Sequence, residues 1–244
     1  MTTMGTLPIR WVRGMRRRES GRLVHTRLRW YREPSRTYRL TGGVLSPALF
    51  RLLMRMEVSG LANVPATGPV ILAANHPDNL DPYLLLYLVP RMVHVAARPD
   101  GFGTGGLCAV WRRLGAFPAD AWGLHYALGL LAEERVVAIF PQATISLSVG
   151  PARGAVGLLA LRSGAPVVPV AIVGTDRVHL PGSIVGRAPV SVRFGAPVTF
   201  DSNNLGPRRS LAVAGEIMRQ VRSLLTSEQS TALLHPDLDG AVQV

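Results

Sequence analysis

The chain has 244 residues, of which 48% are hydrophobic, and a formal net charge of +12. This length suits one α/β domain with short extensions, and the apolar content is enough for a substantial core. The single cysteine excludes an internal disulfide framework and favours a reducing compartment. Because no stretch reaches 18 apolar residues and Met1 to Arg10 lacks the apolar run of a secretory signal, we expect no membrane-spanning helix.

The positive charge is concentrated at the amino terminus. Residues 1–40 contain eleven arginines and two glutamates, a balance of 11 − 2 = +9, and the whole chain contains no lysine. Arginine stays charged and binds phosphate through paired hydrogen bonds, so this arm is suited to a polyanionic partner. The two candidates are an anionic membrane surface and nucleic acid.

The first regular element that the sequence predicts is a short amphipathic helix beginning at Ser46. Ser46 can cap the helix, and Pro47 suits its first turn. The apolar face consists of Leu49, Phe50, Leu52, Leu53 and Met56. This pattern fits a helix packed on the domain and a helix lying in a membrane interface equally well.

Apolar runs then alternate with helical patterns. The predicted strands are 70–74, 92–96, 136–140, 167–172 and 190–194, and the predicted helices are 81–88, 107–114, 122–134, 154–163 and 208–225. This alternation is typical of a mostly parallel sheet covered on both faces. We therefore expect a three-layer α/β/α sandwich over residues 46–226, preceded by an Arg-rich arm (1–45) and followed by a loose tail (227–244).

The predicted strand at 70–74 runs directly into a polar segment that contains His76 and Asp81. In α/β sheets, ligands bind where strands end. The two residues are five positions apart, about 140° around a helix and on opposite faces of a strand, so regular structure cannot pair them. A sharp turn would bring them together, and Pro77, Asp78 and Asn79 are residues that favour one.

A paired His76 and Asp81 would have a defined chemistry. The carboxylate would accept a hydrogen bond from one imidazole nitrogen, which fixes the tautomer and leaves the other nitrogen as a base. Such a base can deprotonate a substrate hydroxyl as it attacks, so no nucleophile from the enzyme is required. The competing interpretation is structural, with His76 a buried polar residue and Asp81 the cap of the next helix.

Residues 75–81 resemble the N-H-x-x-x-x-D signature of the glycerolipid acyltransferase family. Segments 114–120, 140–146 and 168–174 occur in the order of the family's second block, its F-P-E-G-T-R-S block and its V-P-V block. The resemblance covers roughly residues 57–200. It implies a lysophospholipid acyltransferase of the 1-acylglycerol-3-phosphate type, which transfers a fatty acyl group from acyl-CoA or acyl-carrier protein to a lipid hydroxyl without a metal or cofactor.

The chain departs from the family in two of these blocks. Residues 140–146 read Phe-Pro-Gln-Ala-Thr-Ile-Ser, so the family's Glu, Gly and Arg are replaced, and Ala121 follows Asp120 where the family usually has arginine. The family uses these Glu and Arg positions to hold the glycerol phosphate of the acceptor. The replacements leave the identity of the acceptor open.

The predicted substrate-binding residues surround the proposed catalytic pair His76 and Asp81. Gln142 can hydrogen-bond a polar headgroup, and backbone N–H groups near Ala143 and Thr144 are candidate oxyanion donors. Arg153 precedes a predicted helix, whose amino terminus favours an anion, although a solvated surface arginine is an equal interpretation. The full set is Asn75, Asn79, Gln142, Ala143, Thr144 and Arg153.

Rival interpretations remain. Gly101, Gly103 and Gly106 match the dinucleotide-binding pattern, but the match lies in the middle of the chain, after Pro99 and Asp100. The arm suits nucleic acid, although the body lacks a recognition motif. A non-catalytic acyltransferase homologue that binds lipid would fit the altered third block.

Metal and serine-hydrolase chemistry are not expected, since Cys108 is isolated, the histidines are scattered, and Ser183 lacks a G-x-S-x-G context. We expect a peripheral or monotopic protein on the cytoplasmic face of the cell membrane. Its expected partners are an anionic surface, a lipid acceptor and an acyl thioester donor, with acyl-carrier protein as one possible carrier and no nucleic acid.

Overall fold

The computed structural model describes residues 46–98, 114–142, 154–178, 187–201 and 205–234. Several features predicted from the sequence lie outside these ranges. They are the Arg-rich arm, the glycine pattern at residues 101–106, the helix at 107–114 apart from its last residue, and the segment 143–153.

Within the described residues, seven strands form one sheet in the order β1-β7-β6-β2-β5-β3-β4. The strands are β1 (Met54–Ser59), β2 (Val70–Ala74), β3 (Val93–Ala97), β4 (Phe117–Pro118), β5 (Val136–Ile139), β6 (Val167–Val173) and β7 (Ala188–Phe194). From β6 to β4 all neighbours are parallel, whereas β7 is antiparallel to β6 and β1 is parallel to β7. Five strands therefore end at one edge of the sheet, and β1 and β7 begin there.

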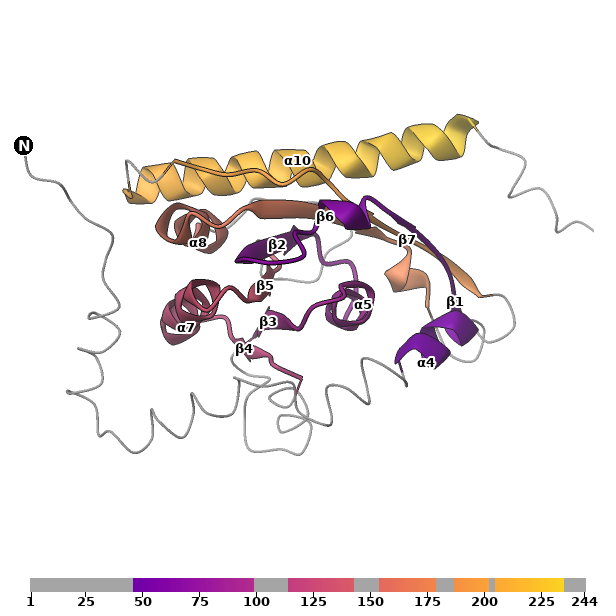
Figure 1. The fold of residues 1–244 in the computed structure, drawn as a ribbon. Helices are drawn as coiled ribbons and strands as arrows, with labels where there is room; N and C mark the ends of the chain where they lie inside the picture. Colours follow the sequence, from indigo (N-terminus) through magenta and orange to yellow (C-terminus); the bar gives the residue numbers. More distant parts are fainter. Residues whose placement is uncertain (1–45, 99–113, 143–153, 179–186, 202–204, 235–244) are drawn as a thin grey trace, which may run out of the picture.

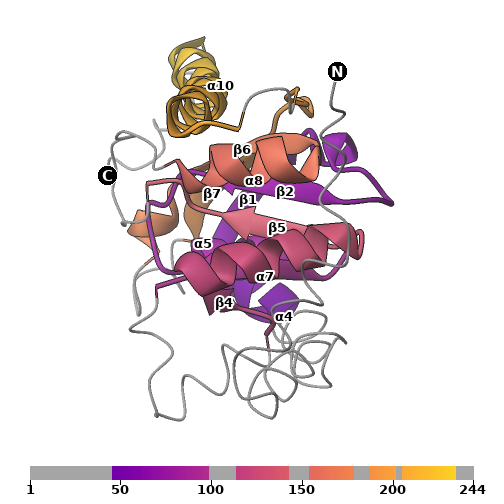
Figure 2. The same ribbon diagram turned by 90° about the vertical axis from the view of Figure 1, so that its left-hand side faces the viewer.

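Helices cover both faces of this sheet. They are α4 (Ser46–Leu53), α5 (Asp81–Leu88), α7 (Ala121–Ala132), α8 (Ala155–Ser163) and α10 (Pro207–Leu234), with short 3-10 turns η2 (Leu61–Asn63) and η4 (Thr175–Arg177). Helices α7 and α8 lie on one face and α5 on the other, while α10 runs along α8 and β6 (Figures 1 and 2). The predicted α/β/α sandwich with a mostly parallel sheet is confirmed.

Strand β2 is central, and all five of its residues are completely buried. Val70, Leu72 and Ala74 face the core that includes α4 and α5, whereas Ile71 and Ala73 face the core that includes α7, α8 and α10. Burial of Val70, Ile71 and Leu72 contributes about 1.5–3 kcal/mol for each side chain, so both layers stabilise the strand. A rigid β2 gives the segment that follows it a fixed starting point.

Helices α8 and α10 pack closely at one glycine. A Cβ atom added to Gly157 would lie 2.0 Å from the backbone oxygen of Ser210, so only glycine permits this approach. The contact fixes α10 against the layer that supports β6.

Some element boundaries differ from the sequence predictions. Strand β2 and helix α5 begin and end at the predicted residues, but the amphipathic helix stops at Leu53, and Met56 lies in β1. The apolar and polar residues of Met-Arg-Met-Glu-Val-Ser alternate, which is a strand pattern that the adjoining helical pattern obscured. The carboxyl-terminal helix extends to Leu234 instead of 225, and so includes part of the expected loose tail.

Arg91 ties together the amino ends of the parallel strands. Its guanidinium donates hydrogen bonds to the carbonyl oxygens of Pro65 (2.9 Å), Gly68 (2.7 Å) and Glu134 (2.6 Å). Burial lowers the pKa of this guanidinium, and Arg135 lowers it further. The planar guanidinium of arginine can donate to three carbonyls at once, so Arg91 links the segments that precede β2 and β5.

Replacement of Arg91 is expected to weaken the fold. Arg91→Met should lower the free energy of unfolding by about 1–3 kcal/mol, because three carbonyls lose their donor, and Arg91→Lys should lower it by less. Urea unfolding measures both variants, with Arg162→Met on the exposed side of α8 as the control. Equal stability of the Arg91 and Arg162 methionine variants would contradict this role.

His94 in β3 is completely buried on the sheet. Its Nδ1 lies 3.2 Å from the carbonyl oxygen of Gly115, and its Nε2 has no hydrogen-bond partner among the described residues. Burial lowers the pKa of His94 from 6.5 to about 4, and the charge of Arg135 acts in the same direction. Between pH 6.5 and about 4, the imidazole is therefore neutral in the folded protein and protonated in the unfolded chain.

Stability should fall with acidity because of His94. Above pH 6.5 both states are neutral, whereas between pH 6.5 and about 4 only the unfolded state gains the proton. The free energy of unfolding should decrease by up to about 3 kcal/mol across this window, as the lowered pKa requires. Urea unfolding from pH 7 to pH 4.5 measures this slope, and His94→Gln should flatten it. An unchanged slope in that variant would exclude His94 as its origin.

Candidate active site

The segment after β2 is anchored to the neighbouring strand β6 by Asn75. The Asn75 amide nitrogen donates to the carbonyl oxygen of Ile172 (2.7 Å), and the amide oxygen accepts from the Ile172 N–H (2.8 Å). The side chain thus continues the hydrogen-bond ladder of the sheet by one more step. Asn75 is 6% exposed, and its amide is directed at protein backbone, so it positions the residue that follows it.

The predicted sharp turn follows His76. The Asp78 side chain accepts from the Leu80 N–H (2.9 Å), which forms a local side-chain turn, and the Asp81 N–H lies 3.2 Å from the Asp78 carbonyl oxygen. Helix α5 begins at Asp81, with Pro82 in its first turn, where a missing N–H costs nothing. The turn therefore brings His76 and Asp81, which are five positions apart, into contact.

His76 and Asp81 form a hydrogen-bonded pair. The distance from His76 Nδ1 to Asp81 Oδ2 is 2.7 Å, and the two side chains are 16% and 0% exposed. Because the carboxylate accepts a hydrogen bond from the Nδ1–H group, Nε2 is left as the basic nitrogen of the neutral imidazole. The pair can therefore accept a proton from a substrate at its partly open side.

An aromatic ring holds the imidazole in its plane. Phe140, directly after β5, stacks on His76 with ring centroids 4.1 Å apart and an interplanar angle of 22°. Strand β5 is the parallel neighbour of β2, so both rings come from the same edge of the sheet. The stack limits rotation of the imidazole, whose side chain is 16% exposed.

The Asp81 carboxylate accepts two further hydrogen bonds. Its Oδ2 also accepts from the Asp78 N–H (2.8 Å), and its Oδ1 accepts from the Thr175 hydroxyl (2.7 Å). Thr175, which is 94 residues from Asp81 in the chain, was not predicted as a site residue. The available signal was its position directly after the V-P-V block, at the end of the strand beside β2.

The other predicted site residues differ in their burial, and three of them lie outside the described residues. Gln142 is buried (7% exposed) just beyond β5, at the same sheet edge as His76, and Asn79 is exposed in the turn. Ala143, Thr144 and Arg153 lie outside the described residues. Their predicted roles stay predictions.

Asp120 from the second signature has a local structural role. Its side chain accepts from the Gly123 N–H (2.8 Å) and caps the amino terminus of α7. Capping of this kind replaces one of the hydrogen bonds that a helix start lacks.

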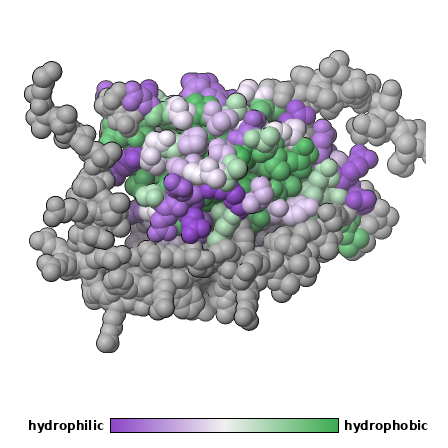
Figure 3. All heavy atoms as spheres, in the orientation of Figure 1, coloured by the Kyte–Doolittle hydropathy of each residue, from purple (hydrophilic) through white to green (hydrophobic). Residues whose placement is uncertain are grey.

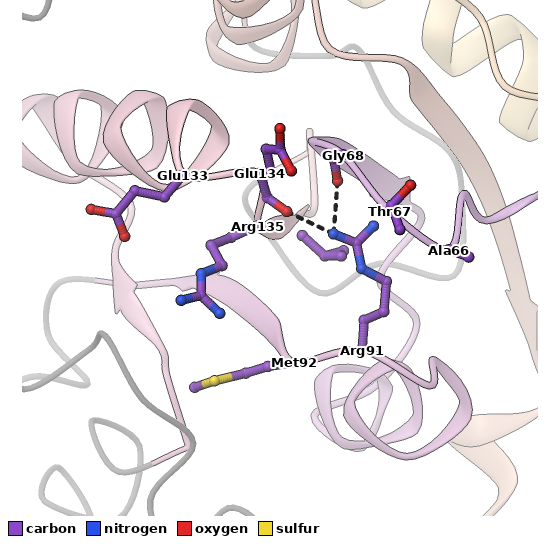
Figure 4. Close-up of a pocket in the computed structure, with 9 residues that line it drawn as sticks. Ala66, Thr67, Gly68, Arg91, Met92, Glu133, Glu134 and Arg135 are labelled. Carbon is purple, nitrogen blue, oxygen red and sulfur yellow. Dashed lines mark hydrogen bonds between the residues drawn. The ribbon is translucent and has the colours of Figure 1, made fainter.

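A cavity of about 260 Å³ lies at the opposite end of the sheet, around Arg91, Arg135 and Met92 (Figure 4). Its lining residues precede β2, β3 and β5 or begin β5, whereas His76 follows β2. The cavity is therefore separate from the His76–Asp81 pair.

The part of the chain that the structure describes contains neither a metal-binding cluster nor a membrane-spanning helix. In these residues, no group of three or more His, Cys, Asp or Glu side chains is arranged to hold a metal ion. None of the helices described is both long and apolar enough to cross a bilayer.

Comparison with known proteins identifies the class to which this fold and site belong. Residues 55–173 match the family model described as Acyltransferase, which is the class of enzyme that the sequence predicts. The matched range includes the N-H-x-x-x-x-D segment at residues 75–81, which resembles the signature of the glycerolipid acyltransferase family.

One solved structure gives the fold a direct counterpart. It is the 1-acyl-sn-glycerophosphate acyltransferase PlsC from Thermotoga maritima, which is 21% identical, with a TM-score of 0.57. The match covers 83% of this chain and 88% of that chain. At this level of identity the likeness shows a shared fold.

Proposed function

We propose that the protein transfers a fatty acyl group from acyl-CoA or acyl-carrier protein to a hydroxyl of a lysophospholipid or related lipid. The observation that carries the proposal is the 2.7 Å contact between His76 and a completely buried Asp81 where β2 ends. A lipid hydroxyl is a weak nucleophile, and a positioned base near neutral pH is what its attack requires.

In the proposed reaction, the hydroxyl oxygen attacks the thioester carbonyl carbon while His76 Nε2 takes the hydroxyl proton. The tetrahedral intermediate then collapses, the carbon–sulfur bond breaks, and the imidazolium returns the proton to the leaving thiolate. Asp81 stays ionised throughout and stabilises the imidazolium through the Nδ1–H hydrogen bond. The products are an ester and a free thiol, so atoms and charge balance.

The acceptor is proposed at the level of its class. The family's charged residues in the third block are replaced here, and Gln142 supplies an amide at a buried position instead. An amide binds a polar headgroup by neutral hydrogen bonds, which are weaker than the charge-assisted bonds of arginine. The proposal therefore names a lipid hydroxyl and leaves the headgroup to be determined by assay.

His76→Ala should lower the rate of thioester-dependent lysolipid acylation by at least about 10²–10⁴-fold, because general-base assistance is lost. Asp81→Asn should also lower it, since an amide cannot stabilise the imidazolium as a carboxylate does. Release of free thiol with a panel of lysolipids measures both effects. His125→Ala, on the exposed surface of α7, is the control and should keep the parental rate. A parental rate in His76→Ala would exclude His76 as the base.

We also propose that α4 docks the protein on an anionic membrane surface at the cytoplasmic face. Met54, directly after α4, pairs with Ala188 at the start of β7, and β7 starts at the sheet edge where β2 ends. Leu49 and Leu52 on this helix are 48% and 52% exposed. Hydrophobic residues also appear at the surface near α4, at the lower right of Figure 3. Exposed leucines on a helix at the site edge suit an interface that supplies a lipid substrate.

The double variant Leu49→Ser, Leu52→Ser should bind anionic vesicles about tenfold or more weakly, because two apolar side chains no longer enter the interface. Vesicle co-sedimentation measures binding, and acylation of a water-soluble short-chain lysolipid checks that the site is intact. Val58→Thr is the matched control, since Val58 is 37% exposed at the other end of β1. Equal binding by the double variant and the parent would contradict docking through α4.

A further inference from the structure

The Asp81 carboxylate has a second oxygen that does not contact His76. Oδ1 accepts a hydrogen bond of 2.7 Å from the Thr175 hydroxyl, and both residues are 0% exposed. The Asp81 carboxylate thus has three described donors, which are the His76 ring, the Asp78 N–H and the Thr175 hydroxyl. A buried carboxylate requires such donors, because water cannot replace them.

The backbone around Thr175 is built to present this hydroxyl. Gly174 has a φ of +88°, and a Cβ atom there would lie 2.2 Å from the backbone oxygen of Pro189. Only glycine therefore allows β6 to turn so closely beside β7 and start the 3-10 turn at Thr175. This backbone places the hydroxyl at the buried oxygen of Asp81.

The end of β6 also fixes Asn75, the residue that precedes His76. Ile172, three residues before Thr175, exchanges two hydrogen bonds with the Asn75 side chain. Ile172 thus fixes the residue before His76, while Thr175 fixes the carboxylate that His76 contacts. The end of β6 and the turn after it therefore fix residues 75–81 on both sides of the His76 imidazole.

We propose that Thr175 is a positioning residue for the His76–Asp81 pair, an inference that rests on the acyl transfer proposed above. Its hydroxyl fixes the rotation of the carboxylate, so that Oδ2 stays directed at His76 Nδ1. It also takes up part of the negative charge at Oδ1. Thr175 touches neither substrate and acts through Asp81.

Thr175→Val tests this role, because valine keeps the shape of threonine and removes the donor. We expect kcat to fall about 10–100-fold, with KM for both substrates within about twofold, because only the transition state uses the oriented pair. A carboxylate that lacks one donor holds the imidazolium proton more strongly. The acid limb of the pH profile of kcat/KM should therefore move to higher pH by about 0.5 or more.

Thr175→Ser is the matched control, since it keeps the hydroxyl and should retain the parental pH profile. A residue with only a packing role would lower the melting temperature without moving the acid limb. If Thr175→Val does not fold, Thr175→Ala has a smaller side chain and carries the same expected shift. A parental kcat and acid limb in either donor-free variant would overturn the inference, as would an equal shift in Thr175→Ser.

His76→Ala separates this inference from the proposed function. A parental rate in His76→Ala would refute the proposed base, and with it the role of Thr175. An inactive His76→Ala beside a parental Thr175→Val would refute the role of Thr175 alone.

Discussion

The structure depends on the hydrogen bonds to one buried carboxylate, that of Asp81, just beyond the end of the central strand β2. Asp81 is completely buried, and its oxygens are bonded by His76, the Asp78 N–H and Thr175. Transfer of an ionised group out of water costs far more than any one of these bonds returns, so the donors act as a set. Satisfying Asp81 fixes the turn, the start of α5 and the tautomer of His76 together.

The sheet topology explains why this carboxylate can be satisfied here. Strand β2 lies between β5 and β6, and each neighbour ends beside it. Strand β5 delivers Phe140 against the imidazole, while the end of β6 delivers Ile172 and Thr175. A central parallel strand thus gathers contacts from segments far apart in sequence, which is why ligands bind at such edges. The match to the acyltransferase family over 55–173 includes all of these segments except Thr175.

The parts of the site that could be predicted from sequence are the local ones. The apolar run of β2 and the turn-forming residues after it made a contact between His76 and Asp81 one of two interpretations, because such a contact closes within one turn. Thr175 could not be predicted, since its contact depends on the register between β2 and β6. Strand β1 was missed because its alternation directly follows a helical pattern. For Asn75, a substrate contact was predicted from its place beside His76, and its bonds to Ile172 could come only from coordinates.

The hydrogen bond to Asp81 leaves one imidazole nitrogen for the whole of the proposed reaction. With Nδ1 occupied by Asp81 and one ring face covered by Phe140, a single nitrogen must serve both the alcohol oxygen and the departing sulfur. Because the lipid hydroxyl itself attacks the thioester in the proposed reaction, donor and acceptor would occupy the enzyme simultaneously. This corresponds to a sequential kinetic scheme through a ternary complex, without a covalent acyl-enzyme.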